Sequence, residues 1–144
     1  MKGKIPAILL SVMISTTLFL TGCQPPAPAA LSNAQVFQVV DKMLKAIDAN
    51  DHQSFSKDFS DEMRNAFTEE QFINLADMLK KASGNYVSCA GSDPDISNNQ
   101  GYAVYRLNCT YDLESVMVTV TFKADGDKVE GLFFDSTNLR EASQ

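Results

Sequence analysis

Few residues in this sequence are of types that could perform chemistry: the chain has 144 residues, with three Cys, four Tyr, one His and no Trp. The lone His52 cannot anchor a zinc site, which needs several His or Cys ligands. A catalytic Ser-His-Asp arrangement through His52 is supported only by the presence of these three residue types in the sequence. Its place beside Asp51, in the first turn of an expected helix, favours an exposed side chain. We therefore expect no metal, no cofactor and no identifiable catalytic residue.

The segment Asp93–Ser97 is similar to the opening of a calcium-binding loop, in which acidic and hydroxyl side chains alternate. Two later positions of that loop do not match. Asn98 stands where the loop needs a glycine, and Val104 stands where it needs a bidentate glutamate. We interpret the segment as an Asx-rich hairpin loop and not as a calcium site.

Cys23 ends a segment with the layout of a signal peptide. Two lysines precede an apolar run, Ile5–Leu20, that is shorter than the roughly 20 residues of a membrane-spanning helix. The residues Leu20-Thr21-Gly22-Cys23 are similar to the lipobox of bacterial lipoproteins. This resemblance implies cleavage before Cys23, a diacylglyceryl group on its sulfur and an acyl chain such as palmitate on its amino group. The alternative is an ordinary secretory peptide whose Cys23 lies near the cleavage point.

Removal of residues 1–22 would leave an acidic domain. The whole chain has a net charge of −6, and the removed segment carries two lysines and no acid, so the processed chain carries −8. This charge argues against nucleic acid as a partner, since a polyanion needs a basic footprint. Membrane association would therefore depend on the lipid. In a bacterium with two membranes, Gln24 in place of Asp favours the outer membrane, facing the periplasm.

The remaining chain is expected to hold one domain. Residues 23–30 contain three of the five prolines and form an extended tether of roughly 20 Å, at about 3.1 Å per residue. Residues 31–138 show no second linker and no internal repeat, so they form one α+β folding unit. Residues 139–144 are expected to be a flexible tail.

Cys89 and Cys109 form an even pair once Cys23 is lipidated, and disulfides are expected in exported proteins. Each lies ten residues from Asn99, within a loop-like stretch, so a symmetric hairpin would place them opposite one another. Opposite residues in an antiparallel pair lie about 4.5 to 5.5 Å apart at Cα, within disulfide range. We predict a structural bond. Two buried free thiols are the alternative, which an asymmetric loop would produce.

Three amphipathic helices are expected before the cysteine pair. Ser32–Gln35 fits a capping box, and apolar residues then recur at helical spacing to a helix end near Asn50. Asp51 could cap a second helix with Phe55, Phe59, Met63 and Phe67 as its buried stripe. Thr68–Gln71 resembles another capping box, and the helix that follows closes at Gly84.

After Gly84 the apolar period changes to two, which predicts strands over 86–90, 102–113, 116–123 and 128–135. Asp125-Gly126 suits the tight turn of a hairpin. With that turn Phe122 opposes Val129 and Val118 opposes Phe133, so apolar partners meet on one face. The prediction is a four-stranded antiparallel meander packed on three N-terminal helices.

This order of elements resembles the nuclear transport factor 2-like superfamily, and in particular a family of small domains of unknown function in bacterial lipoproteins. The resemblance rests on Ile47–His52 at the start of the second helix and on Asp125–Phe134 in the last hairpin. It covers about residues 31–137 and implies a cone in which a bent sheet wraps a helix and encloses a pocket. Its motifs are apolar and support fold better than activity.

The resemblance also implies where a pocket would lie. Strand parity places Tyr105 and Tyr111 on one face, and with Tyr86 and Phe133 they are the expected pocket-lining residues. Steroid isomerases of the superfamily use a pocket Asp with Tyr donors, but spacing identifies no such carboxylate here. The alternative is that Tyr105 and Tyr111 are core aromatics with hydroxyls at the edge.

Three functions stay open from the sequence. The first is a non-enzymatic, lipid-anchored envelope module that binds a protein partner or a small apolar ligand through the concave face of its sheet. The second is an isomerase-like pocket enzyme, marked by a buried acid near Tyr105 or Tyr111. The third is a structural domain that forms homodimers through an open sheet face.

Overall fold

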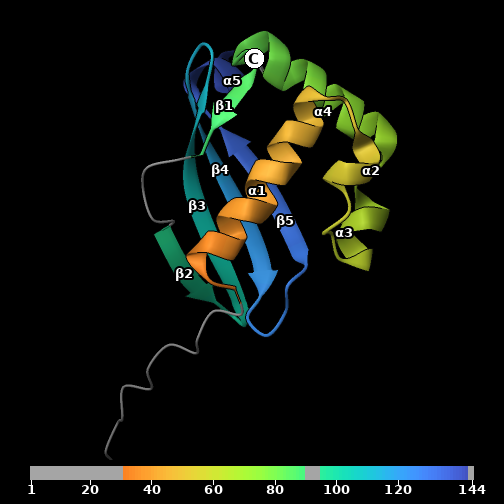
Figure 1. Ribbon diagram of the computed structural model, residues 1–144, viewed down its shortest axis with the longest axis vertical. Helices are drawn as coiled ribbons and strands as arrows, with labels where there is room; N and C mark the ends of the chain where they lie inside the picture. The colour runs from red at the N-terminus through yellow and green to blue at the C-terminus, as the bar shows by residue number, and fades with distance from the viewer. Residues whose placement is uncertain (1–30, 90–94, 143–144) are drawn as a thin grey trace, which may run out of the picture.

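The computed structural model describes residues 31–89 and 95–142 (Figure 1). The signal peptide 1–22, the lipidation site Cys23, the tether 23–30 and the start of the calcium-like segment lie outside the described residues. These predictions are carried by the sequence alone.

The fold is α+β, with helices first and an antiparallel sheet after them, as predicted. Within residues 31–89 and 95–142, four helices lead into five strands, and a fifth helix follows. Their bounds are α1 Asn33–Asp48, α2 His52–Phe55, α3 Asp61–Ala66, α4 Glu69–Ala82, β1 Tyr86–Ser88, β2 Asp95–Asn99, β3 Tyr102–Tyr111, β4 Ser115–Lys123, β5 Val129–Asp135 and α5 Thr137–Ala142.

The strands pair in the order β1-β3-β4-β5, and β2 also pairs with β3. β1 lies against the Thr110–Tyr111 end of β3, whereas β2 lies against Tyr102–Arg106. The two short strands therefore share one edge of the sheet. Four strands of the predicted meander are present, and β2 is a fifth strand where an Asx-rich loop was expected. The loop prediction was wrong because β3 offers backbone hydrogen-bond partners to this segment, and that pairing outweighs its low intrinsic strand propensity.

Helix α1 crosses one face of the sheet and fills it (Figure 1). Its apolar residues pack onto the alternate residues of β3 and β4 that point inward. The most deeply buried of these are Val36, Val40, Met43, Leu44, Tyr105, Cys109, Val116, Val118, Val120 and Phe122. Every one of them is at most 1% exposed, so side chains occupy the inner face of the sheet.

Both predicted capping boxes are confirmed. The Ser32 hydroxyl accepts a hydrogen bond from the backbone of Gln35, and the Gln35 side chain accepts one from the backbone of Ser32. Thr68 and Gln71 do the same at the start of α4. These reciprocal bonds satisfy donors that the first helical turn leaves free.

The predicted second helix is two short helices. α2 ends at Phe55, and the chain then runs alongside β5, where Ser60 N–H donates to the Val129 carbonyl and Val129 N–H donates to that of Asp58. Ser60 then caps α3. The continuous helix was wrong because these bonds to β5 satisfy the backbone that a helix would otherwise use. The aromatic stripe still packs inward, with Phe55 and Phe59 buried.

β5 departs from the predicted register by one residue. Phe122 opposes Val129 as expected, but a β-bulge follows and Val118 opposes Phe134, not Phe133. The bulge places Glu130 where its carboxylate accepts from Ser60 and pairs with Lys123, 2.9 and 3.1 Å away. One extra residue reverses every later side chain. Phe133 therefore points away from the core and is 62% exposed.

The C-terminal segment also differs from the predicted tail. Thr137–Ala142 forms α5, and Leu139 within it is 6% exposed. The Ser136 hydroxyl accepts from the backbone of Leu139 and begins this helix. The domain thus extends past residue 138, because Leu139 gains a buried apolar contact that a free tail would lack.

Candidate functional site

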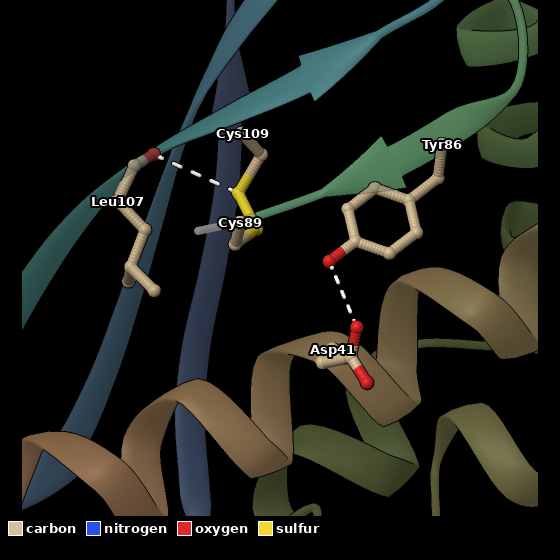
Figure 2. Close-up of a disulfide and its surroundings, with 5 residues drawn as sticks. All are labelled: Asp41, Tyr86, Cys89, Leu107 and Cys109. Atoms are coloured by element: carbon tan, nitrogen blue, oxygen red, sulfur yellow. Dashed lines mark hydrogen bonds between the residues drawn. A yellow bond between two sulfur atoms is a disulfide. The ribbon is translucent and has the colours of Figure 1, made fainter. Parts of the chain in front are cut away.

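A disulfide joins Cys89 and Cys109, as predicted (Figure 2). Their Cα atoms lie 4.2 Å apart, and the pair continues the register in which Ser88 opposes Thr110. The β2–β3 turn is centred later, at Gln100–Gly101, so the hairpin is not symmetric about Asn99 along its whole length. Both cysteines are buried, at 8% and 0% exposure. Burial favours a structural bond over one that exchanges with other thiols.

Beside the disulfide, Tyr86 joins β1 to helix α1. Its hydroxyl donates to Asp41 Oδ1 at 3.0 Å, as Figure 2 shows, and its backbone N–H donates to Asp48 Oδ2 at 2.9 Å. Asp41 and Asp48 are seven residues apart and so lie on one side of the helix. Burial, and then the bond to Asp41, raise the pKa of Tyr86. Two carboxylates of α1 thus hold the sheet edge.

Tyr111 lies next to Tyr86, with ring centroids 5.7 Å apart in an edge-to-face arrangement. Tyr111 is 4% exposed, and its hydroxyl has no hydrogen-bond partner among the described residues. Burial, and then the nearby charge of Asp48, raise the pKa of this hydroxyl. Tyr86, Tyr111, Asp41 and Asp48 form what we call the tyrosine–aspartate cluster.

The other two expected pocket residues lie elsewhere. The Tyr105 hydroxyl is buried and donates to the backbone carbonyl of Leu31 at 3.0 Å, which fastens the start of the domain to β3. Phe133 is on the opposite, exposed face of the sheet. The structure therefore brings together Tyr86 and Tyr111 but not the predicted set of four. The carboxylates that accompany them are Asp48, which is exposed, and Asp41, which is half-buried.

Glu114 collects hydrogen bonds at the same end of the sheet. Its Oε1 accepts from the hydroxyls of Ser83 and Ser136, at 2.7 and 2.6 Å, and its Oε2 accepts from the backbone of Asn138. Burial alone would raise the pKa of Glu114, but these donated bonds lower it. Glu114 thereby connects the end of α4 to the start of α5, a role that sequence spacing did not indicate.

His52 differs from its predicted exposed position. Its ring lies 5.3 Å from that of Phe72, centroid to centroid, and its Nε2 is buried without a hydrogen-bond partner among the described residues. The ring packs α2 against the start of α4. The prediction of an exposed side chain was wrong because the ring packs against Phe72, and this apolar contact outweighs hydration of the ring.

A groove lies between α1 and the segment that contains α2 and the turn after it. Its volume is about 450 Å³. We call it the lysine groove; it is lined by Lys42, Lys45, Ala46, Ala49, Asp51, Ser54, Lys57 and Asp58. The sequence alone did not identify this site. The signal was the pair of lysines three apart with a third lysine just after the next helix.

Two features are absent from the part of the chain that the structure describes. Among residues 31–89 and 95–142, no group of three His, Cys, Asp or Glu side chains lies close enough together to hold a metal ion. No helix in that part of the chain combines the length and the apolar character that a membrane crossing requires.

Comparison with known proteins places the chain in a family. A family model described as "Protein of unknown function (DUF3887)" matches residues 40–132. The match begins within α1 and ends within β5, so it includes the tyrosine–aspartate cluster, the disulfide and the lysine groove. No curated protein and no solved structure matches the chain.

Proposed function

Since the chain belongs to the DUF3887 family, whose function is unknown, we propose a function from its own residues. We propose that the protein is exported, is anchored to the membrane by lipid on Cys23, and serves the cell envelope as a binding module without catalysis. Two or three acyl chains, at about 0.8 kcal/mol per buried methylene, would hold it firmly.

The disulfide is the observation that carries the export proposal. Disulfides persist in the periplasm and at cell surfaces, whereas reducing systems of the cytosol keep thiols free. Cys89 and Cys109 are bonded and buried inside the domain. The third cysteine is Cys23, at the end of the lipobox-like sequence. Because the other two cysteines bond to one another, this arrangement supports lipidation of Cys23.

We propose a binding role because the groups that an isomerase-like enzyme would use already serve the fold. Asp41 and Asp48 accept bonds from Tyr86, and the Tyr105 hydroxyl donates to Leu31. An acid that acts as a base in a pocket needs a free lone pair facing the substrate and shielding from water. The inner face of the sheet, where that pocket would lie, is filled by α1.

We further propose that the fold is of the nuclear transport factor 2-like kind. Helices that precede an antiparallel sheet, with α1 laid across its inner face, support this assignment (Figure 1). An experimental structure of the domain tests it. A sheet that curves around α1 agrees with the proposal, and a flat sheet with α1 on its edge contradicts it.

Cell fractionation tests the anchor. The wild-type chain is expected in the membrane fraction, and Cys23→Ser is expected to lose the lipid and to leave that fraction or to stay unprocessed. Met13→Ser, within the apolar run, serves as a substitution control that leaves the lipobox-like sequence intact. Equal membrane retention of Cys23→Ser and wild type, with normal processing, would contradict the proposal.

Crosslinking in intact cells, with the anchor retained, tests the binding role. A specific envelope component should be captured by wild type and by Tyr105→Phe, which removes only an internal hydrogen bond. A turnover activity that requires Asp41 or Asp48 in folded protein would contradict the proposal and favour an enzyme.

A further inference from the structure

Helix α1 covers one face of the sheet, and the opposite face, which we call the outer face, carries exposed apolar side chains (Figure 1). The alternate residues of β3, β4 and β5 that point away from α1 form it. Phe133 is 62% exposed, and Met117 and Tyr102 are each 38% exposed. Met117 opposes Asp135, two residues after Phe133, so Met117 and Phe133 are diagonal neighbours. Exposed apolar side chains that lie together indicate an interaction surface.

Phe133 projects from the outer face beside a hollow. Gly131 lies two residues earlier on the same strand and the same face, about 7 Å away along β5. A Cβ atom added at Gly131 would lie 3.5 Å from that of Thr121, which is an ordinary contact. Apart from the two chain neighbours of Gly131, no other described residue has an atom within 4 Å of that position. The outer face therefore presents an aromatic ring and, next to it, a space without a side chain of its own.

A second copy of the chain has the shape that fits this ring and hollow. In a dimer with two-fold symmetry both copies use the same patch, and each contact occurs twice. Two outer faces that meet with their β5 strands antiparallel place each Phe133 ring over Gly131 of the other copy. An unrelated partner would need its own ring and hollow at the same spacing, whereas a second copy has them by identity.

The charges of the outer face permit two copies to meet there. The chain has 18 acidic residues against 12 basic ones, so two copies repel one another over most of their surface. On β3, β4 and β5 the charged residues of the outer face are Arg106, Lys123 and Asp135. Asp135 pairs with Arg140 at 2.8 Å, and Lys123 pairs with Glu130 at 3.1 Å. No excess of carboxylates therefore opposes the contact of these strands.

We infer that two copies of the chain pair through their outer faces, with Phe133 of each copy seated over Gly131 and Thr121 of the other. β3 has ten residues, or about 34 Å, and four strand positions of about 4.8 Å give a face of roughly 600 Å². Stable interfaces bury about 800 Å² per partner, so this dimer dissociates on dilution. The inference goes beyond the proposed function and holds whether or not Cys23 carries lipid.

Sedimentation equilibrium of the full chain as isolated from cells, in density-matched detergent, tests the dimer over a range of protein concentrations. The wild type should pass from one to two copies per particle as its concentration rises. Phe133→Ser removes the ring, and Gly131→Val fills the hollow at a residue whose φ is not positive. Each should weaken dimerisation by about tenfold or more, which corresponds to about 1.4 kcal/mol. Ile73→Ser is the matched control, since it removes a 45% exposed apolar side chain from α4, and it should dimerise as wild type does.

Urea unfolding of each variant shows that it is folded before it is compared, and the two variants change the contact from opposite sides. A wild type that stays monomeric at every concentration would overturn the inference. So would a folded Phe133→Ser or Gly131→Val chain that dimerises as tightly as wild type, or an Ile73→Ser chain that is weakened equally.

Photocrosslinking in intact cells identifies what covers the outer face. Photoreactive benzoylphenylalanine in place of Phe133 should join two copies of the chain, through a peptide that contains Thr121 or Gly131. The same group in place of Ile73 should not. A crosslink from position 133 only to a different protein would overturn the choice of a second copy and assign the face to that partner.

Discussion

Helix α1 faces two regions of opposite character. On one side Asp41 and Asp48 accept bonds from Tyr86, beside the buried disulfide. On another side Lys42 and Lys45 line the lysine groove, where Lys42 forms no ion pair with any residue that the structure describes. The difference shows that the polar face of one helix is divided between holding the fold and meeting solvent. Asp41 joins the two, since its other oxygen pairs with Lys45.

We call the tyrosine–aspartate cluster, the disulfide and Glu114 together the closed region. Glu114 follows Tyr111 by three residues and accepts three hydrogen bonds. Substitutions there should lower stability. Substitutions in the lysine groove should leave stability unchanged and alter only what the surface binds. The predictions below test this division in order of expected effect.

Removal of the disulfide should have the largest effect. Cys89→Ala with Cys109→Ala opens a loop with a sequence separation of 20 residues and should lower the free energy of unfolding by about 3 kcal/mol. Urea unfolding of the double variant and of reduced wild type measures this. The two should agree, and an unchanged unfolding midpoint in both would show that the bond is not a stabilising part of the closed region.

Glu114→Ala should follow, with a loss of about 2 kcal/mol, because it leaves the donors of Ser83 and Ser136 without their acceptor. The pKa of Glu114 is lowered in the folded state. Its contribution is therefore present above the ordinary glutamate pKa and is lost as the pH falls through the lowered value. Urea unfolding from neutral to acidic pH should show a shallower acid loss in the variant. An identical pH profile would contradict the role assigned to Glu114.

A matched pair of tyrosine substitutions separates the members of the cluster. Tyr86→Phe removes the hydrogen bond to Asp41 and should cost about 1 kcal/mol. Tyr111→Phe removes a buried hydroxyl that has no partner among the described residues and should cost close to nothing, or stabilise. Thermal and urea unfolding of both variants measure the difference. A larger loss from Tyr111→Phe would mean that this hydroxyl has a partner.

The smallest effect is expected in the lysine groove. K42Q/K57Q removes two exposed charges that form no ion pair within the described residues, so the free energy of unfolding should change by about 0.5 kcal/mol or less. The same urea series reports it, with K81Q/K128Q, which removes two exposed lysines elsewhere, as the control. A loss of unfolding free energy comparable to that of Tyr86→Phe would show that these lysines stabilise the fold. It would contradict the difference drawn between the two regions.

The sequence predicted the parts of the fold in which local signals and packing agree. Both capping boxes and the alternation of β4 follow from residues close together in the chain. The disulfide was also predicted, since a bond is expected between an even pair of cysteines in a chain whose sequence predicts export.

The errors fall where distant residues override local patterns. Backbone hydrogen bonds to Val129 replace the helical bonds that Asp58 and Ser60 would otherwise make. The bulge at Glu130 turns Phe133 outward. The lysine groove needs α1 and the turn after α2 to meet, which helical spacing alone does not predict. The tyrosine–aspartate cluster likewise depends on the approach of β1 to α1.

One mass measurement tests the central claim, that this is an exported and lipid-anchored domain closed by a disulfide. The processed protein is alkylated and weighed, with and without prior reduction. The account predicts a chain that begins at Cys23 and carries acyl groups, with no alkylated cysteine before reduction and two after it. An unmodified Cys23 that alkylates without reductant, or two free thiols at Cys89 and Cys109, would contradict it.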